Sequence, residues 1–590
     1  MNFIKNVLAT VVGIFLFCVI SFFILIGIAA VVSGGENEIK IENNSVIELD
    51  LSKIVFDYAG KYKDESPLQA LIAGKTKIGF IDVLNAIKSA KNDDKIKGIS
   101  IINNQSLLGL AQSKELREQL LDFKKSGKFV YAYANYFTQK EYYINSVADQ
   151  VYVNPVGEVD FKGLHSELLF FKDFQDKTGI KFEVIRHGKY KSAVEPFLNQ
   201  EMSPENREQM TALLNSVWNT IVTDVAASRK IPVEQLNAIA ENLSARTPEM
   251  ALAQKLVDKV AYEDEYHAAI KSKLKVANDE EYKKISITDY TDKNSINVDD
   301  ITKDDIIAVI YAQGEINGGE GDVDFIGEGS INRSLKEARE DKDVKAIVLR
   351  VDSPGGSALT SELIWREIEL TKKIKPVVVS MGNLAASGGY YISCGANAIF
   401  AEPTTITGSI GVFGMLPNMS DLASKVGVNA EQVNTHKNSG GYSPFEPITE
   451  EYKAIALEGV ERTYKTFVTR VATGRKMKFE AVDAIGQGRV WTGTDALKLG
   501  LVDKLGNLDA AIKHAATLGK SKEYRVETYP EYNKNFNEFL ESLAGAKMYQ
   551  SKEAYLKEEI GEENYILIDK IRKMKKRKGI QAIMPYEISF

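Results

Sequence analysis

Apolar positions along this chain form short runs typical of buried strands, separated by stretches with helical periodicity. Ala346–Val351 and Val377–Met381 are the clearest of these runs, and each predicts a strand covered on both faces. A predicted helix from Ala358 to about Leu370 follows the first run. Because strands and helices alternate from Ser45 onwards, the pattern predicts an α/β fold.

This pattern of strands and helices occurs twice along the chain. Four segments of the first half recur in the second half at offsets of 245 to 248 residues. The matching pairs are Lys95–Ile99 with Asp343–Ile347, Lys128–Val130 with Lys375–Val377, Tyr142–Ile144 with Tyr390–Ile392, and Leu256–Lys259 with Leu501–Lys504. A period of this length far exceeds that of solenoid repeats. The sequence therefore predicts two tandem copies of one α/β domain.

The N-terminus carries a long uncharged run. Asn6–Gly35 contains no charged residue, and Val7–Val32 is almost wholly apolar. A cleavable signal peptide has an apolar core of about 7–15 residues, whereas a membrane span needs about 20. We therefore expect an uncleaved transmembrane anchor, with Lys5 on the cytoplasmic side and the rest of the chain outside. The small residues of Ala29–Gly35 leave cleavage open.

Composition narrows the function only slightly. The chain has 590 residues, which predicts at least two domains, and a net charge of −7, which gives no indication of nucleic-acid binding. Its two cysteines, Cys18 and Cys394, indicate neither a disulfide nor a metal site. Cys394 is an alternative nucleophile, but it lies seven residues into a predicted helix, where packing is expected.

One stretch of the second half is suited to acyl transfer. Pro376–Ala401 has no charge, and its strand is expected to lead through a glycine turn into a helix that starts near Ala386. Ser387 would then lie at a helix N-terminus, where free N–H groups can stabilise an oxyanion, although most serines there are simple caps. The turn Pro354–Gly356 can supply further N–H groups at the same sheet edge.

The base is less evident from the residues. None of the five histidines lies in a recognisable triad motif. A buried lysine is the other established solution. The basic segment Arg186–Phe197 offers lysines, but on its own it reads as an ordinary solvated loop.

Four motifs in order resemble one family. DSPGG at 352–356, GNLAASGGYY at 382–391 and TGSIG at 407–411, preceded by YKSAVEPF at 190–197, resemble the signal peptide peptidase A (protease IV) family, long form. This is peptidase family S49, of the Clp protease/crotonase superfamily. The resemblance covers nearly the whole chain. It implies two tandem Clp protease/crotonase-like α/β domains after an N-terminal transmembrane helix.

The resemblance also assigns roles to residues. It implies that Ser387 is the nucleophile, Lys191 the general base, and Ser409 the serine that orients the lysine. Gly388 and one glycine of the pair Gly355 and Gly356 are the implied oxyanion donors; the sequence favours Gly356 without deciding between them. No metal or cofactor is expected.

The two copies differ where these motifs lie. Opposite Ser387 the first copy has Gln139, and opposite the glycine turn it has Ser106–Leu108. Opposite Lys191 the second copy has Gly440 or Tyr442. Each copy is therefore incomplete, and we expect one composite site with the base and the nucleophile from different copies.

The expected domains are an anchor at 1–40, a first α/β domain at 41–300 that supplies the lysine, a second at 301–530 that supplies the serine, and a helical basic tail at 531–590. The charged stretch Val276–Asp305 is the expected linker. Helical character is expected from about Glu523, ending in the basic run Arg572–Lys578.

The resemblance implies a membrane-anchored serine endopeptidase that degrades cleaved signal peptides and other short hydrophobic peptides. It also implies a homotetramer in the bacterial cytoplasmic membrane, single-pass, with the catalytic domains on the extracytoplasmic side. Leu384, Val412, Phe413 and Leu416 can line a groove for such peptides or can equally be core. The alternatives are a crotonase-like acyl-CoA lyase or isomerase, and an inactive membrane scaffold.

Overall fold

The structure is a computed structural model of the protein. It describes residues 5, 10–17, 19–21, 40–52, 54, 56–63, 78–103, 105–294, 303–533 and 581–584. The predicted anchor Val7–Val32 lies mostly outside the described residues; its described parts, 10–17 and 19–21, are helical. Within the described part of the chain, no helix combines the length and apolarity that a membrane crossing requires. The basic run Arg572–Lys578 also lies outside the described residues.

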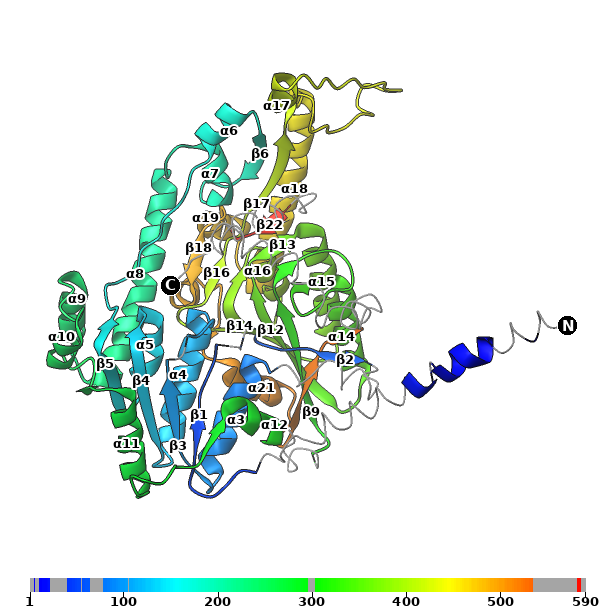
Figure 1. The fold of residues 1–590 in the computed structure, drawn as a ribbon. Helices are drawn as coiled ribbons and strands as arrows, with labels where there is room; N and C mark the ends of the chain where they lie inside the picture. Colours follow the sequence, from blue (N-terminus) through cyan, green and yellow to red (C-terminus); the bar gives the residue numbers. More distant parts are fainter. Residues whose placement is uncertain are drawn as a thin grey trace.

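Two parallel sheets with the same strand order form the body of the molecule (Figure 1). The first has the order β7 (Lys259–Val260), β5 (Gln150–Val159), β4 (Phe129–Phe137), β3 (Ile96–Ile102), β1 (Ser45–Glu48) and β8 (Lys284–Ser286). The second has eight strands, of which six pair in the corresponding order: β19 (Lys504–Leu505), β15 (Ala398–Ala401), β14 (Val377–Ala386), β12 (Val344–Ser353), β9 (Ile306–Gln313) and β20 (Arg525–Tyr529). The other two are β16 (Ile406–Gly408), which pairs with the end of β14, and β18 (Val490–Thr492), which pairs antiparallel with β16. The predicted duplication of an α/β domain is confirmed.

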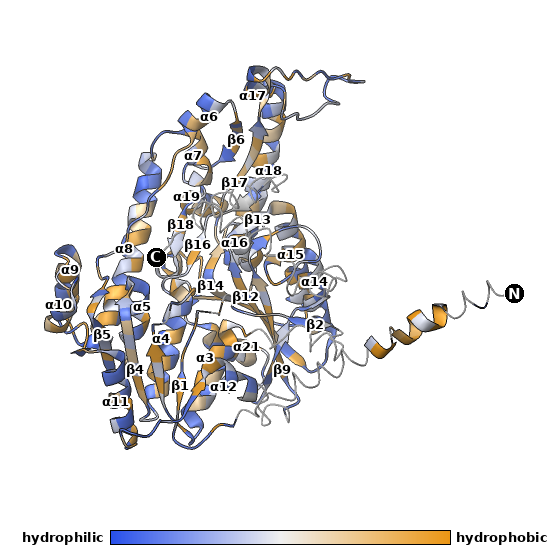
Figure 2. Cartoon of the chain, in the orientation of Figure 1, coloured by the Kyte–Doolittle hydropathy of each residue, from blue (hydrophilic) through white to orange (hydrophobic). Residues whose placement is uncertain are grey.

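The strands are apolar because helices cover both sides of each sheet. All eight residues of β9 are buried, and Figure 2 shows the sheets as the most hydrophobic part of the body. The covering helices include α3 (Phe80–Asn92), α4 (Leu110–Lys124), α5 (Gln139–Asn145), α14 (Glu328–Glu340), α15 (Ala358–Thr371) and α21 (Leu508–Leu518). Parallel sheets require this cover, since neither face can be left to solvent.

Two sequence expectations about connections were wrong. The expected linker contains β8 and α12 (Ile287–Asn294), which complete the first domain. The expected helical tail begins instead with β20 and β21 (Glu531–Asn533). Both errors have one cause: strands of three to five residues are too short to show a period. Only their pairing defines them, β8 with β1, β20 with β9 and β21 with β2 (Lys61–Lys63).

A third sheet extends from the body as an arm, which is formed by the paired strands β6 and β17 (Figure 1). Its order is β11 (Phe325–Ile326), β10 (Glu315–Ile316), β13 (Gly355–Ser357), β22 (Gln581–Ile583), β17 (Val412–Asn418) and β6 (Lys181–His187). β6 of the first copy pairs antiparallel with β17 of the second, from Val412 opposite His187 to Asn418 opposite Lys181. The long helix α18 (Glu450–Arg475) lies beside both strands (Figure 1), and α8 (Pro204–Arg229) is a helix of the same length in the first copy. This pairing carries the lysine motif into the second copy.

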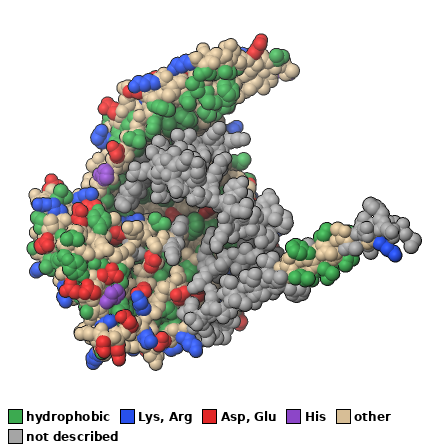
Figure 3. Space-filling model, viewed as in Figure 1, with side chains coloured by type: hydrophobic (Ala, Val, Ile, Leu, Met, Phe, Trp, Pro, Cys, Tyr) green, Lys and Arg blue, Asp and Glu red, His purple; other side chains and the backbone are tan. Residues whose placement is uncertain are grey.

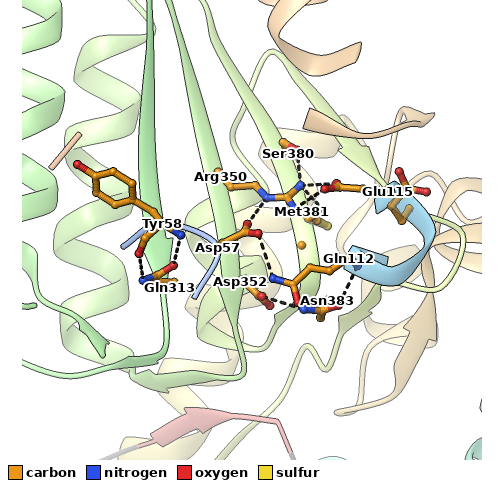
Figure 4. A network of polar contacts seen from close by, with 12 residues as sticks. Asp57, Tyr58, Gln112, Glu115, Gln313, Arg350, Asp352, Ser380, Met381 and Asn383 are labelled. Carbon is orange, nitrogen blue, oxygen red and sulfur yellow. Dashed lines mark hydrogen bonds and ion pairs between the residues drawn. The ribbon is translucent and has the colours of Figure 1, made fainter. Parts of the chain in front are cut away.

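A buried charge network joins the two copies below the arm (Figure 4). Arg350 of β12 is 1% exposed; its Nε lies 2.6 Å from Asp57 Oδ2 and its Nη1 lies 2.8 Å from Glu115 Oε1. Glu115 belongs to α4 of the first copy, and Gln112 on the same helix donates to Asp57 Oδ1 at 3.0 Å. Burial raises the pKa of the Glu115 carboxyl to about 7, although the Arg350 charge opposes the rise.

Replacing Arg350 by Met should destabilise the chain strongly, because two buried carboxylates lose their counter-charge. The expected cost is about 3–5 kcal/mol, measured as a fall in the melting temperature. The control is Lys88→Met, which breaks an exposed ion pair with Asp509 that also joins the two copies. An exposed pair is worth about 0–1 kcal/mol. Equal effects of the two substitutions would contradict a structural role for the buried network.

Candidate active site

Ser387 lies between strand β14 and helix α16 (Gly388–Ser393) in a strained conformation. Its φ is 56° and its ψ is −115°, which is unusual for a residue with a side chain. Two backbone bonds hold it there: its N–H donates to Gly408 O at 2.8 Å, and its carbonyl accepts from Tyr391 N–H at 2.8 Å. The side chain is fully buried. The conformation is thus fixed by the sheet on one side and the helix on the other.

The strand that leads to Ser387 contains a bulge. Val351 pairs with Met381 and Ser353 with Ala385, so Gly382, Asn383 and Leu384 face Asp352 alone. The sequence predicted that the strand ends at Met381 in a glycine turn; β14 instead continues to Ala386. The expected glycine turn is a bulge within β14, because the side chain of Asp352 accepts hydrogen bonds from it.

Asp352 fixes the bulge to the neighbouring strand. Its Oδ1 accepts from Leu384 N–H at 2.9 Å and its Oδ2 from Asn383 Nδ2 at 3.1 Å. Burial, and next the charge of Asp57, raise the pKa of Asp352 to about 6. Asp352 therefore connects the turn after β12 to the segment that ends at Ser387. The sequence places Asp352 in the DSPGG motif but indicates no role for it.

Lys191 follows β6 and reaches Ser387 from the first copy. Its Nζ lies 2.9 Å from Ser387 Oγ, 2.9 Å from Ser409 Oγ and 3.2 Å from Ser409 O. All three residues are fully buried. Burial lowers the pKa of the Lys191 ammonium well below its usual range, and no carboxylate opposes this shift. The structure thus brings the three side chains together in an environment that favours the neutral amine.

The loop that carries Lys191 is held from both copies. Tyr190 N–H donates to Gln487 O at 3.0 Å. A side chain at Gly488, whose φ is +83°, would stand 2.6 Å from Lys191 Cβ, so only glycine fits. Gln209 of α8 donates from Nε2 to Ser192 Oγ at 2.6 Å and to Tyr190 O at 3.0 Å. An interior helical glutamine carries no sequence signal of such a role.

Glycine N–H groups border the serine on two sides. Gly388 is the first residue of α16, and the first N–H groups of a helix have no acceptor within it. Gly355, at a φ of 99°, donates to Ser353 Oγ at 3.1 Å. Both residues are positioned by the ends of adjacent strands, β14 and β12, as the sequence predicted from the two turns.

Gly356 is engaged in strand pairing. It lies opposite Ala582 in the antiparallel ladder of β13 with β22, and Met584 N–H donates to Pro354 O at 2.5 Å. Hydrogen-bonded pairs alternate along such a ladder, so Gly356 and Ala582 form the next one. In this structure the N–H of Gly355 is bonded to Ser353 Oγ and Gly356 lies in the ladder, so the choice between the two glycines as oxyanion donor stays a prediction.

The position of the first copy that is equivalent to Ser387 holds Gln139, which makes different contacts. Gln139 accepts from Gly163 N–H at 2.8 Å and donates to Gly163 O at 2.9 Å. Gly163 corresponds to Gly411, whose carbonyl is 3.5 Å from Ser387 Oγ. Gln139 therefore occupies the place of the serine as a structural clamp. In the second copy, Gly440 is exposed and Tyr442 is half-buried, away from any equivalent of the lysine loop.

The turn after β3 also differs from its counterpart. Ser106 Oγ accepts from Leu108 N–H at 3.1 Å, as Ser353 Oγ does from Gly355. The first copy reaches its next helix one residue sooner, and Leu107 and Leu108 stand where the second copy has Pro354, Gly355 and Gly356.

Neither alternative nucleophile nor alternative base is placed for catalysis. Cys394 is fully buried, its Sγ lies 3.2 Å from Tyr391 O, and burial raises the pKa of its thiol to about 12. All five histidines lie in the described part of the chain, and none is a hydrogen-bond partner of Ser387.

Comparisons with known proteins identify relatives of the whole chain. The model of peptidase family S49 matches residues 122–277 and 369–522. "Protease 4" of Salmonella typhi is 34% identical over 562 residues, which cover 92% of this chain and 89% of that protein. "Protease 4" of Haemophilus influenzae is 35% identical, covering 85% and 83%. "Serine protease SPPA, chloroplastic" of Arabidopsis thaliana is 34% identical, covering 72% and 64%.

Two solved structures match more distantly. A ClpP1 mutant from Listeria monocytogenes is 14% identical, with a TM-score of 0.24, and covers 35% of this chain and 94% of its own. A mutant of a membrane-bound stomatin-specific protease is 18% identical, with a TM-score of 0.27, and covers 39% and 99%. The sequence matches, rather than these two structures, define the relatives.

Replacing Lys191 by Met should change how stability depends on pH. Below the usual lysine pKa of about 10.4, the unfolded chain holds a proton that the folded protein, with its lowered pKa, does not. Wild-type stability should therefore rise with pH, relative to the variant, by up to about 1.4 kcal/mol per pH unit in that window. Melting temperatures of both proteins across the alkaline range measure this difference.

The control for that experiment is Lys189→Met, since Lys189 is exposed. Its pH dependence should follow the wild type. Parallel curves for wild type and Lys191→Met would mean that Lys191 keeps its proton in the folded state.

Proposed function

The chain belongs to peptidase family S49 and is a serine-type peptidase, and we propose that Ser387 and Lys191 are its catalytic dyad and that cleaved signal peptides are its substrates. One observation carries the assignment of the dyad. A buried lysine with a lowered pKa lies 2.9 Å from the hydroxyl of a strained serine at a helix N-terminus. A nucleophile within hydrogen-bond distance of its base is the geometry that covalent catalysis needs.

In the proposed mechanism the neutral Lys191 amine takes the proton of Ser387 Oγ as the oxygen attacks the scissile carbonyl carbon. The N–H groups of Gly388 and of one glycine of the pair Gly355 and Gly356 stabilise the resulting oxyanion. The Lys191 ammonium then protonates the leaving amine, and the C–N bond breaks. Water hydrolyses the acyl ester with Lys191 again as base. Ser409, within hydrogen-bond distance of Lys191 Nζ, orients the amine throughout.

Signal peptides as substrates are supported by names and by the lining of the site. One relative, 38% identical over 215 residues, is named "Putative signal peptide peptidase SppA" in Enterococcus faecium. Near Ser387 a buried apolar cluster includes Ala386, Ile406 and Val490, with Leu384 packed against it. An apolar lining suits the hydrophobic core of a signal peptide.

We also propose that the protein is anchored by its N-terminal apolar run in the bacterial cytoplasmic membrane, with the catalytic domains outside, and that it acts as a homotetramer. Hydrophobic side chains gather along one face of the arm (Figure 3). The exposed ones on and beside the arm include Leu169, Phe174, Val426, Val428, Val433, Phe445 and Ile455. A patch of this kind favours contact with another subunit or with a membrane.

The dyad is tested by substitution of both members. Ser387→Ala and Lys191→Ala should each lower kcat for a signal-peptide substrate by at least about 10⁴-fold, and the double variant should be no worse, because the two groups act as a unit. The wild-type kcat/KM should rise with pH through an apparent pKa well below 10.4 and then level off, since the neutral amine is the active form.

Lys189→Ala and Cys394→Ala are the matched controls and should retain activity. Covalent labelling of Ser387 by a serine-directed phosphonate separates a peptidase from an acyl-CoA lyase or a scaffold. Near wild-type turnover by Lys191→Ala would exclude the proposed base.

The anchor is tested by mass. The protein extracted from membranes should have the intact mass of the full chain, because an apolar run of this length is expected to stay in place. A chain starting at Lys40 serves as the control and should be recovered without detergent. Loss of roughly the first thirty residues from the extracted protein would show a cleaved signal peptide.

A further inference from the structure

The guanidinium of Arg489 lies over two aromatic rings, one of which directly precedes the base in the chain. Its Cζ is 4.8 Å from the centroid of the Tyr190 ring and 4.4 Å from the centroid of the Trp491 ring. Its Nη1 lies 2.8 Å from Oε1 of Glu208, and Oε2 of the same carboxylate accepts from the Tyr190 hydroxyl at 3.1 Å. Glu208 belongs to α8 of the first copy, which packs against β18 of the second (Figure 1). The Arg489 side chain therefore ties the neighbour of Lys191 to the second copy.

The main chain of the same segment binds the serines that contact the lysine. The carbonyl oxygen of Arg489 accepts from Ser409 N–H at 2.7 Å, and the φ of Ser409 is 50°, a conformation that residues with side chains rarely adopt. Trp491 lies against Gly408, because a side chain at Gly408 would stand 2.8 Å from Trp491 Cδ1. The carbonyl oxygen of Gly408 in turn accepts from Ser387 N–H. Arg489 and its aromatic neighbour thus contact the chain beside the orienting serine and beside the nucleophile.

The first copy lacks this arginine. Thr247 and Thr492 are the N-cap residues of equivalent helices, and 245 residues separate them. The same offset places Ser244 opposite Arg489. A serine can neither lie over a ring as a cation nor pair with a carboxylate as a guanidinium does. The arginine is therefore specific to the copy that holds the nucleophile.

We propose that Arg489 is a positioning residue for the reaction, which holds the loop that carries Lys191 closed against the two serines and so keeps water from the amine. This inference rests on the proposed dyad of Ser387 and Lys191. Arg489 acts through Tyr190, by its side chain, and through Ser409, by its carbonyl oxygen. Without the guanidinium the loop should loosen, the amine should become hydrated, and its charged form should become less costly.

The charges around the loop decide how the proposal can be tested. The charged or titratable side chains on the loop and on the segments packed against it include Arg186, His187, Lys189, Glu195, Glu208 and Arg489. Through its field alone, loss of the Arg489 cation would raise the pKa of Lys191, as loosening of the loop would. Loss of the Glu208 carboxylate separates the two effects, because through its field alone it would lower that pKa.

Arg489→Met and Glu208→Ala test the proposal together. Each should move the apparent pKa of kcat/KM upward, because each loosens the loop. The value of kcat near neutral pH should fall about 10-fold for each unit by which that pKa rises, while KM stays close to the wild-type value. An unchanged pH profile in Arg489→Met, or a downward shift in Glu208→Ala, would overturn the positioning role.

Arg229→Met is the matched control. Arg229 ends α8, far along the helix from Glu208, and its side chain is 8% exposed and paired with Asp258. Its loss should cost stability without moving the apparent pKa. The Glu208 side chain is 55% exposed, so Glu208→Ala should fold even if Arg489→Met does not, and its pH profile alone can refute the proposal.

A stability measurement keeps the test independent of catalysis. Wild-type stability should rise with pH between the lowered pKa of Lys191 and the usual lysine value of about 10.4, and Lys191→Met removes that rise. In the Arg489→Met background the rise should begin at higher pH, so Lys191→Met should change the melting temperatures less. An equal effect of Lys191→Met in both backgrounds would overturn the proposal. Full activity of Lys191→Ala would instead overturn the proposed base and leave the melting result valid.

Discussion

The removal of one lysine from water is the constraint on which the site depends. Lys191 is fully buried, its hydrogen-bond partners are serine oxygens, and desolvation alone lowers its pKa. A carboxylate nearby would have restored the ammonium and removed the base. The surrounding structure therefore has to bury the amine closely while offering only neutral groups. The glycines at 411 and 488 permit that approach, since a side chain at either would press on Lys191.

Much of the fold was predictable, because long apolar runs indicate the buried strands and the repetition of these runs indicates two copies of one domain. Most residues of the strands that hold Ser387 and the glycine turn are buried, so the apolar character of these strands shows in the sequence. β8, β20 and β21 were missed because strands of three to five residues show no period. The motifs pointed to Ser387, while Lys191 depended on a family resemblance, because nothing local separates it from Lys189. Lys191 is placed by the pairing of β6 with β17 and by contacts of its loop with Gln487 and Gly488.

The remaining parts of the site are contacts between residues far apart in the chain. Gln209 and Gly488 hold the lysine loop from separate elements, and Asp352 fixes the bulge across two strands. The pairing of residues 581–584 with the glycine turn could not be predicted either, since a short apolar segment near the C-terminus shows no distinguishing pattern in the sequence. In the first copy, Gln139 satisfies the backbone that Ser387 leaves open for chemistry. The first copy thus has a hydrogen-bonded glutamine at the point where the second copy has a strained serine.

The pairing of β6 of the first copy with β17 of the second has a consequence for symmetry. The first copy gives a strand and the second receives it, so the contact is heterologous. Counterparts of both surfaces are left over in each chain: residues 164–170 correspond to the receiving strand, and residues 428–434, exposed and irregular, correspond to the strand that is given. A heterologous contact joins two different surfaces and therefore has no two-fold axis. If such contacts were repeated from chain to chain, they would close as a ring or extend as a filament.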